Sequence, residues 1–221
     1  PAFRAEARFL RALSYWHGID FFRNIPFYTE EQLVGGDPPA QAGSAEIYDF
    51  LVSELQAIEG EMLDPGTAPY GRADRAALWM LQAKLYLNAE VYAGKSAYNE
   101  CVEACNKIIN SGVYNLVEDY QHNFLADNDN SEEIIFAVNF DGEATQTFGG
   151  TTYLVHAALG GAMTDTDYGV TGAWGGLRTT PSLVDLFPDE TGNIDERAIF
   201  FTEGQTKAVE EISQFTNGYA V

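Results

Sequence analysis

The residues best suited to bind a ligand are aromatic side chains on glycine-rich sequence in the second half of the chain. Trp174 lies in the segment GVTGAWGGLRTT, where glycines precede and follow it and neither a helical nor a strand period continues. A large aromatic in so flexible a context is poorly placed for a core and well placed for display. Sugar rings carry apolar C–H faces that pack on such planes. The sequence therefore predicts a sugar-stacking surface at Trp174.

Three further residues are predicted to complete this surface. Tyr153, in a segment expected to form a strand, would extend the aromatic platform, and Tyr168 is a third member. Arg178, four residues after Trp174, could donate hydrogen bonds to sugar hydroxyls from the same loop. The alternative is that these aromatics plug a core beside the helices.

An acidic segment at 127–133 is a candidate metal site. Its sequence, DNDNSEE, alternates Asp127 and Asp129 with asparagine, as in loops that offer oxygen ligands to calcium. The EF-hand spacing is absent, because that loop needs glycine at its sixth position and glutamate at its twelfth. A structural calcium on Asp127 and Asp129 competes with a solvated acidic turn. No cofactor is required by any other motif.

Catalytic motifs are missing from the sequence. It has no Gly-x-Ser-x-Gly elbow, phosphate-binding glycine loop, His-Glu-x-x-His or dinucleotide fingerprint. His17, His122 and His156 lie far apart in the sequence, and each is predicted to be a structural hydrogen-bonding residue rather than a base. Composition alone does not exclude a carboxylate pair of the glycosidase type.

The charge balance excludes several partner classes. The 221 residues include 33 Asp and Glu against 12 Lys and Arg, for a formal net charge of −21. Nucleic acid is not an expected partner, because binding phosphates needs clustered Lys and Arg. A basic face for anionic lipid is also missing. No apolar run reaches the roughly 18 residues of a membrane span.

Periodicity divides the chain near residue 112. Apolar spacing predicts four helices, the second capped by Ser44, at about 3–23, 44–61, 72–93 and 97–111. Beyond them the chain is glycine-rich, and strands are expected at 133–139 and 151–156. The fold class is therefore mostly α, with residues 1–111 as a helical scaffold and residues 112–221 as a loop-rich, short-strand, ligand-binding region packed on it.

The first and third predicted helices resemble each other. Four residues of the first match four of the third at a constant offset of 71: Ala5, Leu10, Ala12 and Tyr15 with Ala76, Leu81, Ala83 and Tyr86. This is close to twice the roughly 34-residue period of tetratricopeptide repeats. Small residues at fixed places let neighbouring helices approach closely. The helical half is thus predicted to form tetratricopeptide-like helix pairs, unless two amphipathic helices match by chance.

Several segments carry a family resemblance. AEARFLRALSYWHGIDFFRNIPF, GRADRAALWMLQAKLYL, SGVYNLVEDYQHNFLADNDNSEEIIFAV and TTPSLVDLFPDETGNIDERAIF resemble, in this order, motifs of the SusD/RagB family. The resemblance runs over nearly the whole chain. It implies a non-enzymatic, glycan-binding lipoprotein of the outer membrane in Bacteroidetes-type bacteria, built on tetratricopeptide-like helices. In the starch-binding branch an arc of aromatics cradles an α-glucan, and Trp174 and Tyr153 fall about where two of its members would.

The resemblance also implies partners and a location. Members are lipid-anchored on the extracellular face and sit on a SusC-like TonB-dependent transporter. The helical half is expected to lie against that transporter and to make no sugar contact, with Trp79 and Tyr86 in the core. The chain is expected to be an internal piece of a longer protein, with membrane attachment only through a lipid anchor outside it. The alternatives are a helical-repeat scaffold that binds only protein and a glycoside hydrolase fragment.

Overall fold

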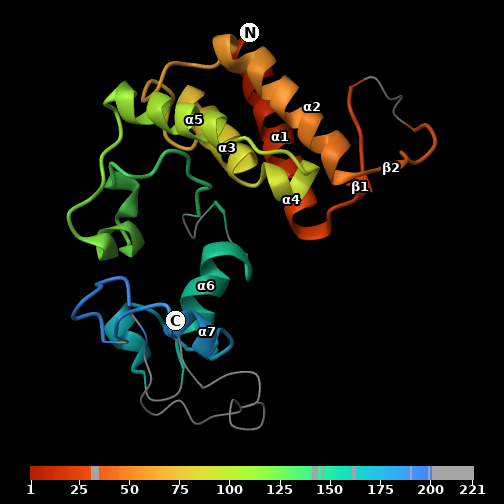
Figure 1. Ribbon diagram of the computed structural model, residues 1–221. Helices are drawn as coiled ribbons and strands as arrows, with labels where there is room; N and C mark the ends of the chain where they lie inside the picture. The colour runs from red at the N-terminus through yellow and green to blue at the C-terminus, as the bar shows by residue number, and fades with distance from the viewer. Residues whose placement is uncertain are drawn as a thin grey trace. The chain divides into compact units, whose positions relative to one another are not determined.

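The protein is described by a computed structural model that is mostly helical (Figure 1). It describes residues 1–30, 35–140, 144–145, 147–160, 163–189, 191–198 and 200. Two compact units are present. The first comprises Pro1–Val117 with Ala126–Val138, and the second comprises Glu118–Leu125 with the chain from Asn139 onward. The two units are described separately below.

The first unit is built from helices. They are α1 (Ala2–Phe22), α2 (Ser44–Ile58), the 3₁₀ turn η1 (Glu59–Glu61), α3 (Arg75–Leu87), α4 (Ala89–Ala93), α5 (Tyr98–Ser111) and the 3₁₀ turn η3 (Asn128–Asn130). Two short strands, β1 (Ile25–Pro26) and β2 (Gln41–Ala42), pair antiparallel, with Ile25 opposite Ala42. Helix α1 packs on α2, and α3 packs on α5, so the mostly α, helix-pair prediction is confirmed.

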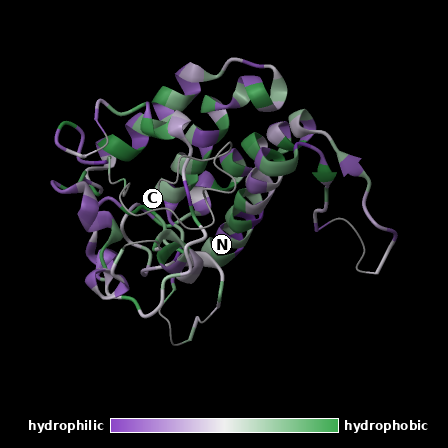
Figure 2. Ribbon diagram, turned by 90° about the horizontal axis from the view of Figure 1, so that it is seen from below, coloured by the Kyte–Doolittle hydropathy of each residue, from purple (hydrophilic) through white to green (hydrophobic). Residues whose placement is uncertain are grey.

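Amphipathic helices place the core of this unit between them. Figure 2 shows hydrophobic and hydrophilic residues alternating along the helical ribbons, as expected when one stripe of each helix is buried. The side chains with almost no exposed surface are Phe9, Ile19, Ile47, Leu51, Leu55, Ile58, Leu78 and Leu85. The matched alanines Ala5, Ala12, Ala76 and Ala83 are buried as well. Leu10 departs from the repeat, because its side chain faces solvent.

Local signals set the helix ends. Asp74 caps α3 by accepting hydrogen bonds from the N–H groups of Ala76 and Ala77, at 2.8 and 3.2 Å. Gly94 and Gly112 end α4 and α5 in the left-handed conformation, with φ of 64° and 66°. Ser44 was predicted to be a cap and is instead the first helical residue of α2. Its hydroxyl donates to the Tyr92 carbonyl at 2.8 Å, so the side chain expected to cap the helix makes a tertiary hydrogen bond instead.

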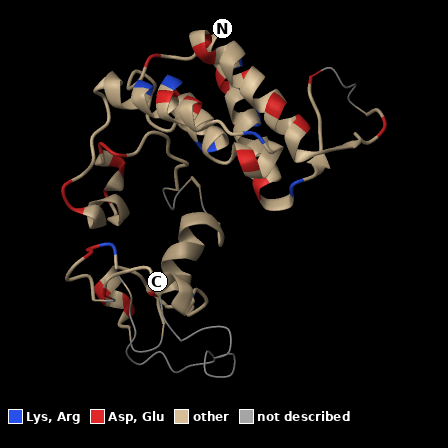
Figure 3. Cartoon of the chain, viewed as in Figure 1, with Lys and Arg blue, Asp and Glu red and all other residues tan. Residues whose placement is uncertain are grey.

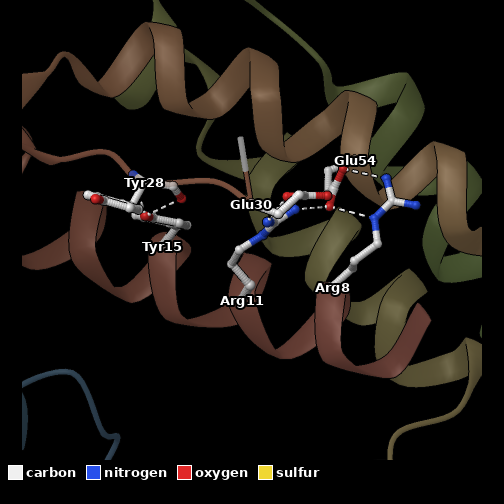
Figure 4. Close-up of polar contacts among 6 residues, drawn as sticks. All are labelled: Arg8, Arg11, Tyr15, Tyr28, Glu30 and Glu54. Carbon is white, nitrogen blue, oxygen red and sulfur yellow. Dashed lines mark hydrogen bonds and ion pairs between the residues drawn. The ribbon is translucent and has the colours of Figure 1, made fainter. Parts of the chain in front are cut away.

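A buried carboxylate joins α1 to α2 (Figure 4). Glu54 is 7% exposed and accepts two hydrogen bonds from Arg8, at 2.8 and 2.6 Å. Arg11 donates to the same carboxylate and to Glu30. Hydrogen bonds from Arg8, the largest cause, and from Arg11 lower the pKa of Glu54 and outweigh burial, which acts to raise it. Charged groups at this interface are therefore paired, as burial requires.

The second unit holds shorter elements. They are the 3₁₀ turns η2 (Tyr120–Phe124) and η4 (Asp165–Tyr168) and the helices α6 (Gly150–Ala158) and α7 (Pro181–Val184). The prediction of a strand at 151–156 is wrong, because those residues lie in α6. The segment 133–139, in which a strand was also expected, forms no strand.

The helical conformation at α6 has a tertiary cause. The β-branched and aromatic residues TTYLVH favour a strand by local propensity. In the fold, however, Ala157 is completely buried, and the carbonyls at the end of the helix are bonded by a later loop. These contacts need helical spacing, and they override the local preference.

Candidate functional site

The end of α6 and the loop 172–178 together build an aromatic surface in the second unit. Trp174 stacks on His156, with ring centroids 4.9 Å apart and planes 20° from parallel. Tyr153, one turn earlier on α6, lies tilted to Trp174 with centroids 6.4 Å apart. Trp174 is 44% exposed and Tyr153 is 42% exposed. Two of the predicted residues are thus brought together with large parts of their rings in solvent.

Backbone hydrogen bonds hold the loop against the helix. The last carbonyls of a helix lack partners within the helix. Here the N–H of Trp174 donates to the His156 carbonyl at 2.9 Å, and the N–H of Gly175 donates to Leu159 at 2.8 Å. The N–H groups of Gly176 and Leu177 both donate to the Ala157 carbonyl. The Trp174 loop is therefore attached to the end of α6 by main-chain hydrogen bonds.

Glycine is required where the loop meets the helix end. Gly175 has a φ of 64°, a region that other residues rarely adopt. A Cβ added to Gly160 would lie 2.8 Å from the Gly175 Cα atom, which is closer than real contacts allow. The glycine-rich composition around Trp174 thus serves close backbone approach as well as display.

The substitution Gly160→Ala adds one methyl group where the loop meets the helix end, and it tests how closely the two must pack. We expect Gly160→Ala to lower the free energy of unfolding by about 1–3 kcal/mol, the usual cost of forcing extra volume into packed structure. Chemical denaturation followed by circular dichroism would measure it. Gly176→Ala is the matched control, since its Cβ would meet the nearest atoms at ordinary distances of 3.6 and 3.8 Å. Equal stabilities for the two variants would contradict the tight contact.

His156 is the member that sequence reasoning did not assign to the surface. Its Nδ1 donates to the Gly172 carbonyl at 2.7 Å, which fixes the ring beneath Trp174. The prediction that His156 is a structural hydrogen-bonding residue therefore agrees with its bond to Gly172. Its stacking on Trp174 was not predicted. Because the segment was expected to be a strand, His156 and Tyr153 were not expected one helical turn apart. On a helix, residues three apart share a face.

Arg178 and Tyr168 occupy different places near this loop. The Arg178 guanidinium lies against Gly160 and donates to the Leu177 carbonyl at 2.6 Å, and its Nε is buried without a hydrogen-bond partner. Tyr168 ends η4 and is 52% exposed. Within the described chain its ring does not stack on Trp174. The link between η4 and the loop is Asp165, whose carboxylate accepts from the Gly172 N–H at 2.8 Å. Sugar contact by Arg178 or Tyr168 stays a prediction.

In the first unit, Asp127 precedes η3 and Asp129 lies within it, and both are exposed. The Asp127 carbonyl accepts from the backbone and side-chain nitrogens of Asn130, at 3.2 and 3.1 Å. Across the residues that the structure describes, no group of three or more His, Cys, Asp or Glu side chains gathers as a metal site. Calcium binding by Asp127 and Asp129 therefore stays a prediction.

Chelation tests the calcium prediction. A cation that binds only the folded protein raises its melting temperature by mass action. We expect excess EDTA to lower the melting temperature of the purified chain and added calcium to restore it. Asp127→Asn should remove this response. A melting temperature that does not respond to EDTA would indicate a solvated acidic turn instead.

Two proteins of known name are similar to this chain in sequence. The chain is 40% identical over 188 residues to the starch-binding protein SusD of Bacteroides thetaiotaomicron, which covers 83% of this chain. The chain belongs to the SusD/RagB family. It is also 30% identical to the SusD-like protein P25 of Formosa agariphila over 62% of its length. The chain spans 33% and 25% of the lengths of these two SusD-like relatives. No family model matches the chain.

Solved SusD-like structures have the same fold. A SusD superfamily protein from Parabacteroides distasonis superposes with a TM-score of 0.71 at 25% identity, covering 98% of this chain and 47% of that one. Surface glycan-binding protein A from B. thetaiotaomicron, solved in complex with laminarihexaose, gives a TM-score of 0.61 at 21% identity, covering 84% of this chain and 39% of that one. The resemblance read from the sequence motifs is thereby confirmed.

Proposed function

We propose that this SusD-like chain binds neutral polysaccharides or oligosaccharides without cleaving them. The observation that carries the proposal is the exposed Trp174 ring, stacked on His156 and flanked by Tyr153, on a backbone fixed to the end of α6. Aromatic planes of this kind suit the C–H faces of pyranose rings. The relatives support it by name, one as starch-binding and one as glycan-binding in complex with laminarihexaose.

The proposed setting is the outer surface of the bacterial outer membrane. The glycan would be delivered to a SusC-like TonB-dependent transporter, and a lipid anchor would hold the intact protein in place. Among the described residues, no helix is both long enough and apolar enough to cross a bilayer. Acidic residues outnumber basic ones (Figure 3), which disfavours polyanionic glycans as ligands.

Binding and turnover can be separated in one experiment. The chain would be titrated with maltohexaose and laminarihexaose while tryptophan fluorescence is followed, and reducing ends would be assayed in the same samples. We expect saturable binding with a micromolar or weaker Kd, about −8 kcal/mol or less favourable, and no new reducing ends. Release of reducing ends would identify a glycoside hydrolase. Binding of neither sugar, nor of other neutral glucans, would contradict the proposal.

A further inference from the structure

The first unit contains a groove along α3 and α5, which lie side by side in Figure 1. Its larger part has a volume of about 720 Å³ and is lined by Trp79, Asn106 and Asn110, among others. A smaller hollow of about 190 Å³ reaches α2 and is lined by Gln82 and Tyr86. Glu103 and Lys107 line both parts. We call this the α3–α5 groove.

Gln82 lines the smaller hollow with a carboxamide that has no hydrogen-bond partner among the described residues. Its side chain is 4% exposed. Its polar atoms are not among the fully buried atoms without a partner, so they are open to a ligand in the hollow. Tyr86 beside it receives only a 3.5 Å contact from Gln56, so its hydroxyl proton is available to a ligand. A ligand with both donors and acceptors would satisfy these groups.

Helix α5 supplies a polar wall to the same groove. Glu103, Asn106 and Asn110 follow helical spacing and so share a face. Within the described chain, Glu103 forms no ion pair. Lys107 on that face is already neutralised, because its Nζ lies 2.8 Å from the Glu59 carboxylate. Glu100, on the same helix, also lines the smaller hollow, so the wall offers carboxamides and two carboxylates rather than a free cation.

Trp79 adds an aromatic plane. Its Nε1 donates to the same Glu59 oxygen at 2.8 Å, and the Lys107 ammonium lies 5.8 Å from its ring centroid. These two contacts hold the indole at the edge of the groove, half-buried against the core. The expectation of a core position is thus met by Tyr86 and only in part by Trp79.

We propose that the α3–α5 groove is a second binding site for a neutral sugar residue. Carboxamides can donate to and accept from vicinal hydroxyls, the carboxylates accept from them, and Trp79 offers a plane for the C–H face. Anionic ligands are disfavoured by the unpaired Glu103. A cationic ligand is the competing occupant, because the carboxylates of Glu100 and Glu103 would pair with it, and the test below separates the two. The site lies in a different unit from Trp174, and it departs from the expectation that residues 1–111 make no sugar contact.

The test uses the full chain carrying Trp174→Ala, which removes the aromatic surface of the second unit. Binding of maltohexaose and laminarihexaose is measured by saturation-transfer NMR and by the remaining tryptophan fluorescence. We expect residual binding that Gln82→Leu weakens at least tenfold, while the melting temperature stays the same because the amide has no hydrogen bond within the described chain to lose. Asn110→Ala, at an exposed position, should weaken the same binding without touching the core.

Each result decides between the sites. Asn99→Ala on the exposed side of α5 is the control and should leave residual binding unchanged. If Trp174→Ala removes all binding that the unaltered chain shows, the groove is not a sugar site and the proposed function stands. If Gln82→Leu removes binding and Trp174→Ala does not, the groove stands and the aromatic surface is wrong. A deca-lysine peptide that binds where neither sugar does would identify a cationic partner and overturn the proposal.

Discussion

Trp174→Ala is expected to weaken glycan binding at least tenfold, about 1.4 kcal/mol, with little loss of fold stability. The substitution removes the largest exposed ring of the platform, together with the surface that His156 and Tyr153 support. The backbone bond from residue 174 to the His156 carbonyl does not involve the side chain, so alanine retains it. Titration with maltohexaose and a thermal melt would measure both effects.

Control variants distinguish the effect of removing Trp174 from the effect of removing any exposed aromatic side chain. Phe148→Ala removes a ring that is 86% exposed in the same unit, and it should leave affinity unchanged. Trp174→Phe keeps a smaller plane and should retain part of the affinity. A Trp174→Ala variant that unfolds would show that Trp174 is a core residue. A folded variant that binds normally would remove Trp174 from the site.

The second large effect is expected at the α1–α2 interface. Glu54→Ala leaves Arg8 and Arg11 without their shared carboxylate, and breaking such a buried pair costs about 3 kcal/mol or more. Urea denaturation of the purified chain would measure the loss. Asp49→Ala on the same helix is the control, because its ion pair with Lys95 is exposed and should contribute less than about 1 kcal/mol. Similar losses in the two variants would show that the Glu54 cluster adds nothing special.

The same carboxylate predicts a pH dependence. Because the pKa of Glu54 is lowered in the fold, its ionised form is favoured by folding. Its stabilising contribution is therefore fully present above the ordinary pKa of 4.5 and is lost as pH falls through the lower, folded value. Glu54→Gln should show a smaller decrease in the free energy of unfolding between pH 5 and about pH 3. Parallel decreases in the two proteins would assign the acid sensitivity to other carboxylates.

Helices of the first unit could be predicted well from sequence because their signals are local. Apolar residues at helical spacing placed helix ends at 93 and 111, immediately before the glycines that end α4 and α5 in the structure. The predicted helix 72–93 is interrupted, since Asn88 ends α3 and begins α4. Ser44 failed as a cap because its hydroxyl bonds a residue distant in sequence, which no local pattern reveals.

The candidate site could be predicted only in part, for a similar reason. Glycines around Trp174 signalled display, and its partner Tyr153 was named. The conformation that unites them was missed, because the segment holding Tyr153 favours a strand locally and is made helical by distant contacts. His156 lies in the aromatic surface because its segment is helical. The unpartnered state of Gln82 depends on which side chains surround it, so composition and spacing gave no sign of it.

Main-chain bonding between α6 and the Trp174 loop has an evolutionary consequence. The N–H groups of residues 174, 175, 176 and 177 carry the attachment, and any non-proline residue supplies one. The side chain at position 174 can therefore be exchanged while its anchoring persists. If Trp174 contacts the glycan as proposed, mutation there can alter ligand preference without first destabilising the scaffold, whereas Gly160 and Gly175 are constrained by geometry. On the same proposal, this separation of anchoring from display would let the recognised sugar change by substitution at a few displayed positions.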